Sequence, residues 1–397
     1  MKRIGVIGGG QLAWMMASAA QELGIELVIQ TPDSTDVAVS LAAEVIFAAV
    51  DDVAATKLLA TKCDVITFEN EFVDLVGLGK LEPVFLPPLG NEFVDSIGLG
   101  KLEPVFMPPL AALAPLLDKY TQRCYLRDLG LPVPKFAVLE QPELPSGFEF
   151  PVVVKARRNG YDGQGTFVIE DKSALVDLYH RYPDTPFLVE EFVEFDRELA
   201  IIAARGISGE VIIYPILETQ QEEQVCRRVF TLDDLSDQIV ETCRSIASKL
   251  LISLDAIGVF GIELFATGDG RVLVNEIAPR THNSGHLTIE ACATSQFSQL
   301  IRAVAGLPLG STELTCGGAV MVNLLGYEDS HSDFLAKRQE IAAMPNAHVH
   351  WYAKESRIGR KLGHVTVLVD VASSSAPHSY RQQAEALARQ VELIWSK

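Results

Sequence analysis

The chain has 397 residues, of which 48% are hydrophobic, and its formal net charge is −19 at pH 7. This length allows two or three domains with substantial cores, and the lack of any apolar run of about 18 or more residues excludes a membrane-spanning helix and is typical of a soluble protein. The acidic balance disfavours nucleic acid and anionic membranes as partners, so an anionic small substrate must be bound by local basic clusters.

A glycine-rich segment follows the first predicted strand. Residues 3–7 form a short apolar strand, and Gly8-Gly9-Gly10-Gln11-Leu12-Ala13 leads into a predicted helix that ends near Leu23. The spacing matches G-x-G-x-x-A, which is typical of a dinucleotide-binding strand-turn-helix, but the second strand, 26–30, has no acidic residue at its tip to hold a ribose hydroxyl. We therefore predict a doubly wound domain whose glycine loop approaches another phosphate or sugar, with NAD binding as the alternative.

A near-exact repeat follows the strand predicted at 64–68. Residues 70–90 recur as 91–111, and the two copies of 21 residues differ at four positions. Two copies are too few for a solenoid, so a recent duplication and an artefact of sequence assembly both explain them. Only the first copy directly follows the strand, so Glu71 is a candidate site residue and Glu92 is its duplicate.

A second glycine-rich loop lies between two predicted strands in the middle of the chain. The strand at 151–155 ends in Lys155, and the loop at 156–166 leads into a strand at 167–170. Because a Walker A loop precedes a helix, this loop is of another kind. We predict a flap that covers a triphosphate with backbone N–H groups while Lys155 supplies a point charge. The alternative is an ordinary hairpin loop.

A predicted hairpin brings two acidic residues together. Runs rich in aliphatic and aromatic residues flank Asp269-Gly270, a strong signal for a two-residue turn. Such a turn places Glu263 opposite Glu276, with Cβ atoms roughly 5 Å apart. A divalent cation would relieve the repulsion between them, and carboxylate oxygens suit Mg²⁺ that carries nucleotide phosphates. The alternative is an exposed hairpin with two solvated glutamates.

Polar and basic segments follow this hairpin. Residues 280–286 contain Arg280, His282 and His286 directly after a strand end, where chemistry is commonly placed. Four cations between Lys354 and Lys361 predict an anion clamp, and a solvated basic loop is the alternative.

Three of these motifs together resemble the 5-(carboxyamino)imidazole ribonucleotide synthetase family of ATP-grasp enzymes. They are the flap at 160–165, the run at 275–286 and the clamp at 357–364, and the resemblance covers nearly the whole chain. It implies an α/β fold with an N-terminal doubly wound parallel-sheet domain (1–115), an ATP-grasp lid domain (116–194) and a large α+β domain with the C-terminal part (195–397). It also implies de novo purine biosynthesis, in which 5-aminoimidazole ribonucleotide, bicarbonate and ATP with Mg²⁺ react through carboxyphosphate to give the N-carboxylated ribonucleotide, ADP and phosphate.

The resemblance also implies residue roles, a homodimer and a cytoplasmic enzyme. Six scattered cysteines without C-x-x-C spacing agree with a reducing compartment and with the absence of a zinc site or disulfide framework. The implied ATP-binding residues are Lys119, Lys155, Gly160, Gly163, Gln164, Gly165, Thr166, Glu190, Glu191, Phe192, Val193, Glu198, Asn275 and Glu276. The implied metal ligands are Glu263 and Glu276. The implied ribonucleotide-binding residues are Gln11, Leu12, Glu71, Asn283, Ser284, Lys354, Arg360 and Lys361, and the implied catalytic residues are Arg280, His282, Tyr161 and Asp162.

The chain departs from the family pattern at several places. Gln221 stands where the family usually has a histidine near the nucleotide, Asn159 replaces a usual flap glycine, and the duplication lies beside Glu71. Three alternatives stay open at this stage. The first is a related ATP-grasp ligase such as a formate-dependent glycinamide ribonucleotide transformylase, although that enzyme would usually carry an acid at the position of Gln11. The second is a nicotinamide-dependent oxidoreductase, and the third is a catalytically inactive binding protein.

Overall fold

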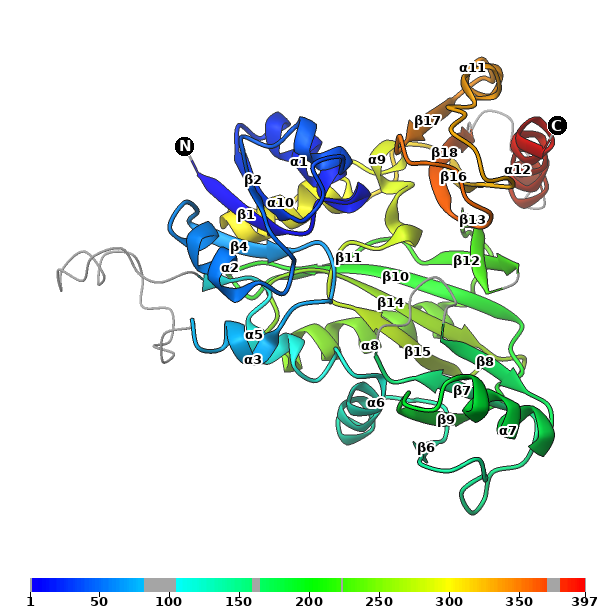
Figure 1. Cartoon of the computed structure of the whole chain (residues 1–397). Coiled ribbons are helices and arrows are strands. Elements are labelled where there is room, and N and C mark those ends of the chain that lie inside the picture. The colour runs from blue at the N-terminus through cyan, green and yellow to red at the C-terminus, as the bar shows by residue number, and fades with distance from the viewer. Residues whose placement is uncertain (1, 82–104, 159–164, 223, 370–378, 397) are drawn as a thin grey trace.

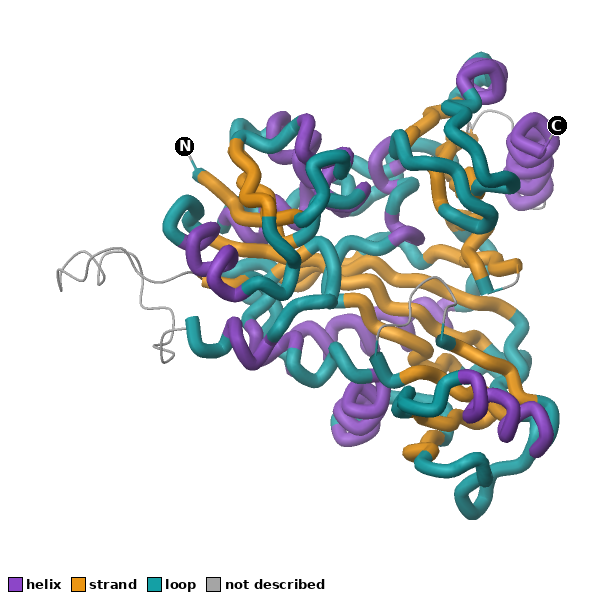
Figure 2. Tube along the Cα trace, in the orientation of Figure 1, coloured by secondary structure: helices purple, strands orange, loops and turns teal. Residues whose placement is uncertain are grey.

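The computed structural model describes residues 2–81, 105–158, 165–222, 224–369 and 379–396. Three sheets organise these residues. In Figure 1 the N-terminal sheet lies at the upper left, the four-stranded sheet at the lower right and the C-terminal strands at the upper right, while β10, β14 and β15 run between them. Figure 2 shows that helices flank these sheets on several sides. The sheets therefore meet around the central strands.

The N-terminal sheet is parallel and has the order β3-β2-β1-β4-β5. Its order reverses between β1 and β4, so the loops that leave these two strands diverge and open a crevice at their carboxyl ends. This confirms the predicted doubly wound arrangement. The strands are β1 (Arg3–Ile7), β2 (Glu26–Thr31), β3 (Glu44–Phe47), β4 (Val65–Phe68) and β5 (Val105–Phe106), and the helices are α1 (Gln11–Glu22), η1 (Val37–Ser40), α2 (Val53–Ala60), α3 (Leu75–Leu78) and α5 (Leu110–Leu113).

The four-stranded sheet is antiparallel and has the order β6-β9-β7-β8. Its core contains Val152, Val154, Leu175 and Phe187, because alternate residues of β7 and the apolar side of α7 face the same layer. The strands are β6 (Phe136–Leu139), β7 (Val152–Ala156), β8 (Thr166–Ile169) and β9 (Phe187–Glu191), and the neighbouring helices are α6 (Lys119–Asp128) and α7 (Lys172–Arg181).

The nine-stranded sheet continues from the centre of the molecule into the C-terminal part. Its order is β15-β14-β10-β12-β13-β16-β18-β17, with β11 paired to β10. The pairing of β13 with β16 joins the two parts. The strands are β10 (Arg197–Arg205), β11 (Val211–Ile213), β12 (Leu217–Glu222), β13 (Val225–Thr231), β14 (Gly258–Ala266), β15 (Val272–Ala278), β16 (Gly318–Leu325), β17 (Ala347–Trp351) and β18 (Lys361–Val369).

Helices cover this sheet with their apolar sides. Helix α8 buries residues that recur every three or four positions, including Ile246, Ala247 and Leu250, against β10 and β14. On the other side, α10 packs against α1 of the N-terminal domain, and Met16 and Leu300 share one buried cluster. The N-terminal domain is thereby fixed to the central sheet. The helices are α8 (Asp237–Ser253), η2 (Asn283–Gly285), α9 (Thr288–Ala291), α10 (Gln296–Ala305), α11 (Leu335–Ala342) and α12 (Ser379–Ser396).

The turn between β14 and β15 differs from the predicted one. The Thr267 N–H donates to the Arg271 carbonyl at 3.0 Å, and the Gly270 N–H donates to the Thr267 carbonyl at 2.9 Å. The loop therefore consists of Gly268, Asp269 and Gly270, and the prediction of a two-residue Asp269-Gly270 turn is wrong. Gly270 has a φ of +83°, which is the left-handed conformation that closes a three-residue hairpin loop.

A β-bulge further along the hairpin compensates for this longer loop. Leu264 pairs with Val274, whereas Glu263 pairs with Glu276, so Asn275 is an extra residue in β15. The bulge shifts the register by one residue and restores the predicted opposition of Glu263 and Glu276. The predicted facing pair is thus confirmed.

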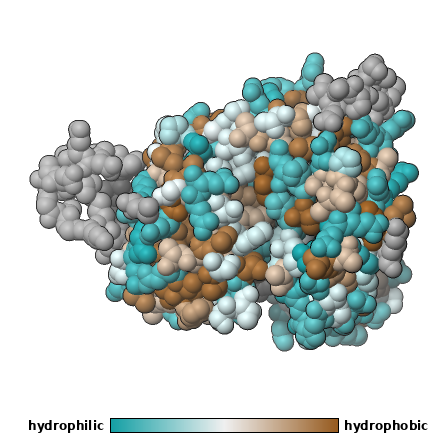
Figure 3. Space-filling view, turned by 90° about the horizontal axis from the view of Figure 1, so that it is seen from above, coloured by the Kyte–Doolittle hydropathy of each residue, from teal (hydrophilic) through white to brown (hydrophobic). Residues whose placement is uncertain are grey.

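The surface mixes polar and apolar residues. On the face shown in Figure 3, hydrophilic residues are interspersed with hydrophobic ones over most of the molecule. Within the described residues, no helix has both the length and the apolar character needed to cross a membrane.

The repeat residues that the structure describes on either side of 82–104 together amount to almost one copy of the repeat. Residues 70–81 come from the first copy and 105–111 from the second. Deleting residues 84–104 joins Pro83 to Val105 and restores one continuous copy, so we expect the melting temperature and the activity to be retained. Thermal unfolding and turnover measurements check this.

Deleting residues 70–90 provides a matched control. Its product differs from that of the first deletion only by Ser in place of Leu75 and Ile in place of Val76. Leu75 is partly buried and packs against the N-terminal core, so the control protein should melt at a lower temperature. Loss of folding in both products would show that both copies are required.

Candidate active site

Two carboxylates of unequal charge state face each other on β14 and β15. Glu276 Oε1 lies 2.5 Å from Lys119 Nζ, and Glu263 Oε2 accepts a hydrogen bond from Asn275 Nδ2 at 3.3 Å. Burial and the neighbouring Glu276 raise the pKa of Glu263 to about 7. Burial also acts to raise the pKa of Glu276, but the charges of Lys119 and Lys155 outweigh it, and the pKa is lowered. A cation shared by the two oxygens would remove their mutual repulsion.

This pair fits a magnesium ion that arrives with nucleotide phosphates. The Glu263 and Glu276 side chains keep 26% and 40% of their surface exposed, so both remain accessible to a ligand. Among the residues that the structure describes, no group of three or more His, Cys, Asp or Glu side chains is arranged to hold a metal alone. Mg²⁺ commonly uses one or two carboxylates and takes its other ligands from phosphates and water. The donor set is therefore suitable for a nucleotide-carried ion.

A closed ring of buried hydrogen bonds fixes Lys155 beside the carboxylate pair. Lys155 Nζ lies 2.9 Å from Glu190 Oε2 and donates to Asn275 Oδ1 at 2.9 Å. Arg123 Nε pairs with Glu190 Oε1, and Arg123 Nη2 donates to the Asn275 carbonyl at 2.5 Å. The charged groups of Arg123, Lys155 and Glu190 are almost fully buried. The ring links α6, β7, β9 and the bulge of β15.

The ring changes the interpretation of Glu190. Burial alone would raise the pKa of Glu190, but Arg123 and Lys155 bring it down to about 2. Its carboxylate therefore holds two cations, and its contact with adenosine stays a prediction. Sequence reasoning missed Arg123. The signal was present, because Lys119 and Arg123 are four residues apart on one face of a helix that begins at the Asp118 cap.

Three of the predicted adenosine-binding residues lie beside the loop that joins β14 and β15. Glu191, Phe192 and Val193 line a cavity of about 770 Å³ together with residues of the β14–β15 loop. Glu198 lies on β10, two residues from Ala200, which pairs with Glu263 of β14. Burial and Glu263 raise the pKa of Glu198 to about 7, and a hydrogen bond from Gln221 acts in the opposite direction. The structure thus places Gln221 beside Glu198, which is a predicted ATP-binding residue.

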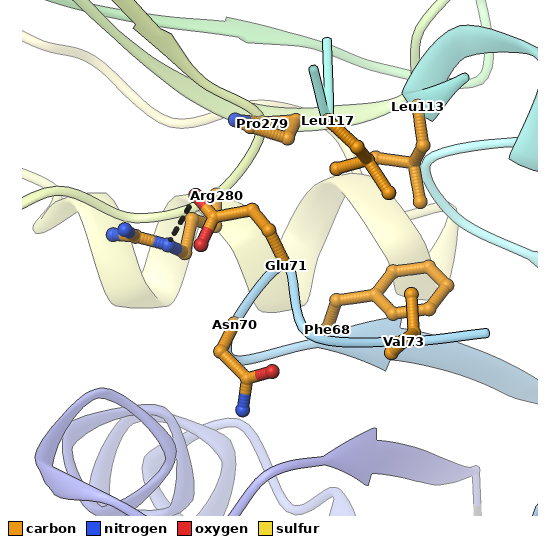
Figure 4. Close-up of a pocket in the computed structure, with 8 residues that line it drawn as sticks. All are labelled: Phe68, Asn70, Glu71, Val73, Leu113, Leu117, Pro279 and Arg280. Atoms are coloured by element: carbon orange, nitrogen blue, oxygen red, sulfur yellow. Dashed lines mark ion pairs between the residues drawn. The ribbon is translucent and has the colours of Figure 1, made fainter. Parts of the chain in front are cut away.

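The other end of the site lies at the crevice of the N-terminal sheet. Arg280 Nε pairs with Glu71 Oε1 at 2.8 Å above an apolar floor that includes Phe68 (Figure 4). Lys354 donates to Gln11, although 343 residues separate them in the chain. The glycine loop, the first repeat copy and the basic clamp therefore meet here.

Glu69 is a further acidic residue that sequence reasoning left out of the site. A Cβ atom placed on Gly10 would lie 2.6 Å from Glu69 Oε1, so the glycine loop and this carboxylate are in close contact. Burial raises the pKa of Glu69. The rule that selected Glu71, its position after a parallel strand, applies equally to Glu69.

His282 lies between the two ends. Its Nδ1 is 2.8 Å from Ser284 Oγ, and its Nε2 is 3.4 Å from Glu263 Oε1. A Cβ atom on Gly261 would lie 2.5 Å from the His282 Cβ, so the glycine allows this approach. Asn283 exchanges amide hydrogen bonds of 3.1 and 2.8 Å with Asn323 of β16. The polar segment after β15 is thus brought against the carboxylate pair.

Comparison with known proteins identifies the family. The N5-carboxyaminoimidazole ribonucleotide synthase of Synechococcus elongatus is 48% identical over all of this chain and 96% of its own length. The chain belongs to this family of ATP-grasp ligases. Family models match at residues 1–87 (ribonucleotide synthetase preATP-grasp domain), 124–297 (ATP-grasp domain) and 319–376 (phosphoribosylaminoimidazole carboxylase C-terminal domain).

Solved structures of the family have the same fold. The N5-carboxyaminoimidazole ribonucleotide synthetase of Thermotoga maritima is 35% identical with a TM-score of 0.82, and the alignment covers 99% of this chain and 98% of that one. The synthase of Aspergillus clavatus in complex with ADP and 5-aminoimidazole ribonucleotide is 28% identical with a TM-score of 0.84, covering 100% and 98%. The family resemblance and the ATP-grasp fold predicted from the sequence are confirmed.

Other predicted family residues are placed less directly at the site. The Leu12 side chain is buried in the core shared by α1 and α10, so only its backbone is available to a ligand. Arg360 is exposed and donates to the Glu355 carbonyl at 3.1 Å. Lys361 begins β18, and its charge acts on Glu263. Gly165 and Thr166, at the end of the predicted flap, belong to the described residues. Glu92 and the other flap residues lie outside them; these flap residues are Asn159, Gly160, Tyr161, Asp162, Gly163 and Gln164.

The Glu190 ion pairs predict a pH-dependent contribution to stability. The folded pKa of about 2 is below the ordinary value of 4.5, so the stabilisation is fully present above pH 4.5 and is lost as the pH falls toward 2. Glu190→Gln should lower the unfolding free energy by roughly 3 kcal/mol at neutral pH, and the difference from the parent should shrink below pH 4.5. Urea unfolding from pH 7 to 3 measures this.

The adjacent exposed residue supplies the control. Glu191→Gln should change the unfolding free energy by only about 0.5 kcal/mol, because its carboxylate lies at the surface. Equal losses in the two variants, or a difference for Glu190→Gln that does not depend on pH, would contradict the assigned ion pairs.

Proposed function

We propose that this protein carboxylates 5-aminoimidazole ribonucleotide with bicarbonate and ATP, giving 5-(carboxyamino)imidazole ribonucleotide, ADP and phosphate. The observation that carries the proposal is the placement of two groups of cations, with Lys119 and Lys155 beside the carboxylate pair and Arg280 and Lys354 beside the first repeat copy and the glycine loop. His282 lies between them, 3.4 Å from Glu263. The Aspergillus clavatus relative was solved with ADP and the same ribonucleotide, which supports this choice of substrates.

Glu263 and Glu276 would hold Mg²⁺, which offsets negative charge on the nucleotide phosphates when bound. Lys119 and Lys155 would contact the same phosphates as point charges, and the flap at 160–166 would exclude water. Residues 116–194 would act as the lid, and Lys155 would be kept in place by the buried ring during closure. Phe192 and Val193 would contact the adenine.

The reaction has two bond-forming steps. An oxygen of bicarbonate attacks the γ-phosphorus of ATP, and the bond to the β-phosphate oxygen breaks, so that carboxyphosphate and ADP form. The exocyclic amine of the ribonucleotide then attacks the carboxyl carbon, or CO₂ released from carboxyphosphate; phosphate departs and takes up the proton that the amine loses. Arg280 and Lys354 would offset the charge of the two anions, and His282 would orient the reacting carboxyl group.

The substrate end would bind the ribonucleotide between loops of different domains. Gln11, Glu69 and Glu71 follow strands of the parallel sheet, whereas Asn283, Ser284 and the basic clamp come from the large domain. We further propose a cytoplasmic homodimer, because the family resemblance implies one and because the six cysteines are free thiols.

The decisive experiment measures ADP release with ATP, Mg²⁺ and 5-aminoimidazole ribonucleotide, with and without bicarbonate. We expect ADP formation to require bicarbonate and to be accompanied by one carboxylated product per ADP. Glycinamide ribonucleotide with formate should not support it. ADP formation that is indifferent to bicarbonate would refute the carboxylation.

The carboxylate pair predicts a specific loss of turnover. Glu276→Gln should lower kcat by about 100-fold or more, because the glutamine removes charge from the metal-binding pair and a partner from Lys119. Glu241→Gln, on the exposed side of α8, should keep near-normal turnover. Near-normal kcat in Glu276→Gln, or an equal loss in both variants, would contradict the metal assignment.

A further inference from the structure

Gln296, the first residue of α10, forms hydrogen bonds to the His282 backbone through both its amide oxygen and its amide nitrogen. Its Oε1 accepts the His282 N–H at 2.9 Å, and its Nε2 donates to the His282 carbonyl at 2.7 Å. The residue is 0% exposed. Because a buried amide destabilises the fold unless its polar atoms are paired, its partners indicate why it is there.

The remaining N–H of Gln296 faces a second histidine of the same segment. Gln296 Nε2 lies 3.1 Å from His286 Nδ1. The amide nitrogen can only donate, so Nδ1 accepts, and burial holds the pKa of His286 well below its ordinary value. All three hydrogen-bonding positions used by this amide therefore contact residues 282–286.

The backbone of Gln296 and its neighbours tighten this attachment. A Cβ atom on Gly285 would lie 2.6 Å from Gln296 Oε1, so the glycine allows the amide to lie against the segment. The Gln296 N–H donates to Thr288 Oγ1 at 2.9 Å, and that hydroxyl donates to the Gly285 carbonyl at 2.6 Å. The start of α10 thus holds the segment from several directions.

External contacts are needed because the segment has little regular structure of its own. It contains only the short η2 turn, Asn283–Gly285, and lies between β15 and α9. On its other side, His282 approaches Gly261 and Glu263. A displacement of His282 by about 1 Å would misalign it with the carboxylate pair, and misplacements of this size cost about 100-fold in rate.

We propose that Gln296 is a positioning residue, which holds His282 at the junction of the carboxylate pair and the ribonucleotide end. The inference rests on the proposed function for its kinetic consequence. Because Gln296 is completely buried and its amide contacts His282 and His286, removal of the amide should lower kcat while nucleotide affinity is retained.

Gln299 of the same helix is a matched control. Gln299 is also 0% exposed. Its amide also bonds to the backbone of one residue: Oε1 accepts the Gly310 N–H at 2.9 Å, and Nε2 donates to the Gly310 carbonyl at 3.0 Å. Its partner lies on another loop. Gln299→Leu therefore reproduces the loss of a buried glutamine and of two hydrogen bonds without releasing His282.

The experiment compares Gln296→Leu with Gln299→Leu in the full chain. Bicarbonate-dependent ADP release gives kcat and the KM for 5-aminoimidazole ribonucleotide, and calorimetry gives ADP affinity. We expect Gln296→Leu to have a kcat about 10- to 100-fold below that of Gln299→Leu, with ADP affinity within about threefold. A kcat ratio below about threefold, or an equal loss of kcat and ADP affinity, would overturn the proposal.

Two further measurements keep the test decisive. If Gln296→Leu does not fold, Gln296→Glu, which keeps the size and the acceptor but removes both donors, replaces it under the same criteria. The ¹⁵N ring signals of His282, assigned by their loss in His282→Gln, should shift in the Gln296 variant and stay unchanged in Gln299→Leu. Unchanged signals in both would overturn the positioning role. An absence of bicarbonate-dependent ADP release in the parent protein would contradict the proposed function, while the ring signals would still decide the role of Gln296.

Discussion

The site depends on keeping two carboxylates opposed in one cleft although their charges repel. The structure resolves this by giving them unequal surroundings. Glu276 is 2.5 Å from Lys119, whereas Glu263 accepts a hydrogen bond from the Asn275 amide at 3.3 Å and lies 3.4 Å from His282 Nε2. The pKa of Glu276 is therefore lowered and that of Glu263 is raised to about 7. A cation between them would favour the charged form of both, so nucleotide and metal are expected to bind together.

The bulge at Asn275 connects this pair to the rest of the site. Its amide nitrogen donates to Glu263, its amide oxygen accepts from Lys155, and its carbonyl accepts from Arg123. Because Asn275 is the extra residue, Glu276 rather than Asn275 lies opposite Glu263, while the Asn275 side chain still reaches Glu263 and Lys155. A single irregular residue thus aligns the carboxylate pair with Lys155 and with the four-stranded sheet that carries this lysine.

The sequence was sufficient for the N-terminal parallel sheet and for the ATP-grasp fold, but it failed where the local geometry depends on contacts with distant parts of the chain. The opposition of Glu263 and Glu276 was predicted with the wrong turn, because the longer loop and the bulge displace the register in opposite directions. Local propensity contains no signal for a bulge that is stabilised by Arg123 from α6. The position of the first repeat copy directly after the strand at 64–68 favoured Glu71, which pairs with Arg280, yet the packing of Glu69 against Gly10 became visible only when both loops were placed.

The departure at Gln221 has a physical consequence for the nucleotide end. Its side chain contributes a hydrogen bond to Glu198, whose pKa is raised to about 7 by burial and by Glu263. A histidine at this place would titrate in the same pH range as Glu198, becoming charged as the pH falls while Glu198 becomes neutral, so the contact would change character across neutral pH. Glutamine is neutral throughout and can donate to Glu198 in its ionised form or accept from its protonated form. The substitution therefore preserves a hydrogen bond here while removing one titrating group from a cluster that already contains two carboxylates.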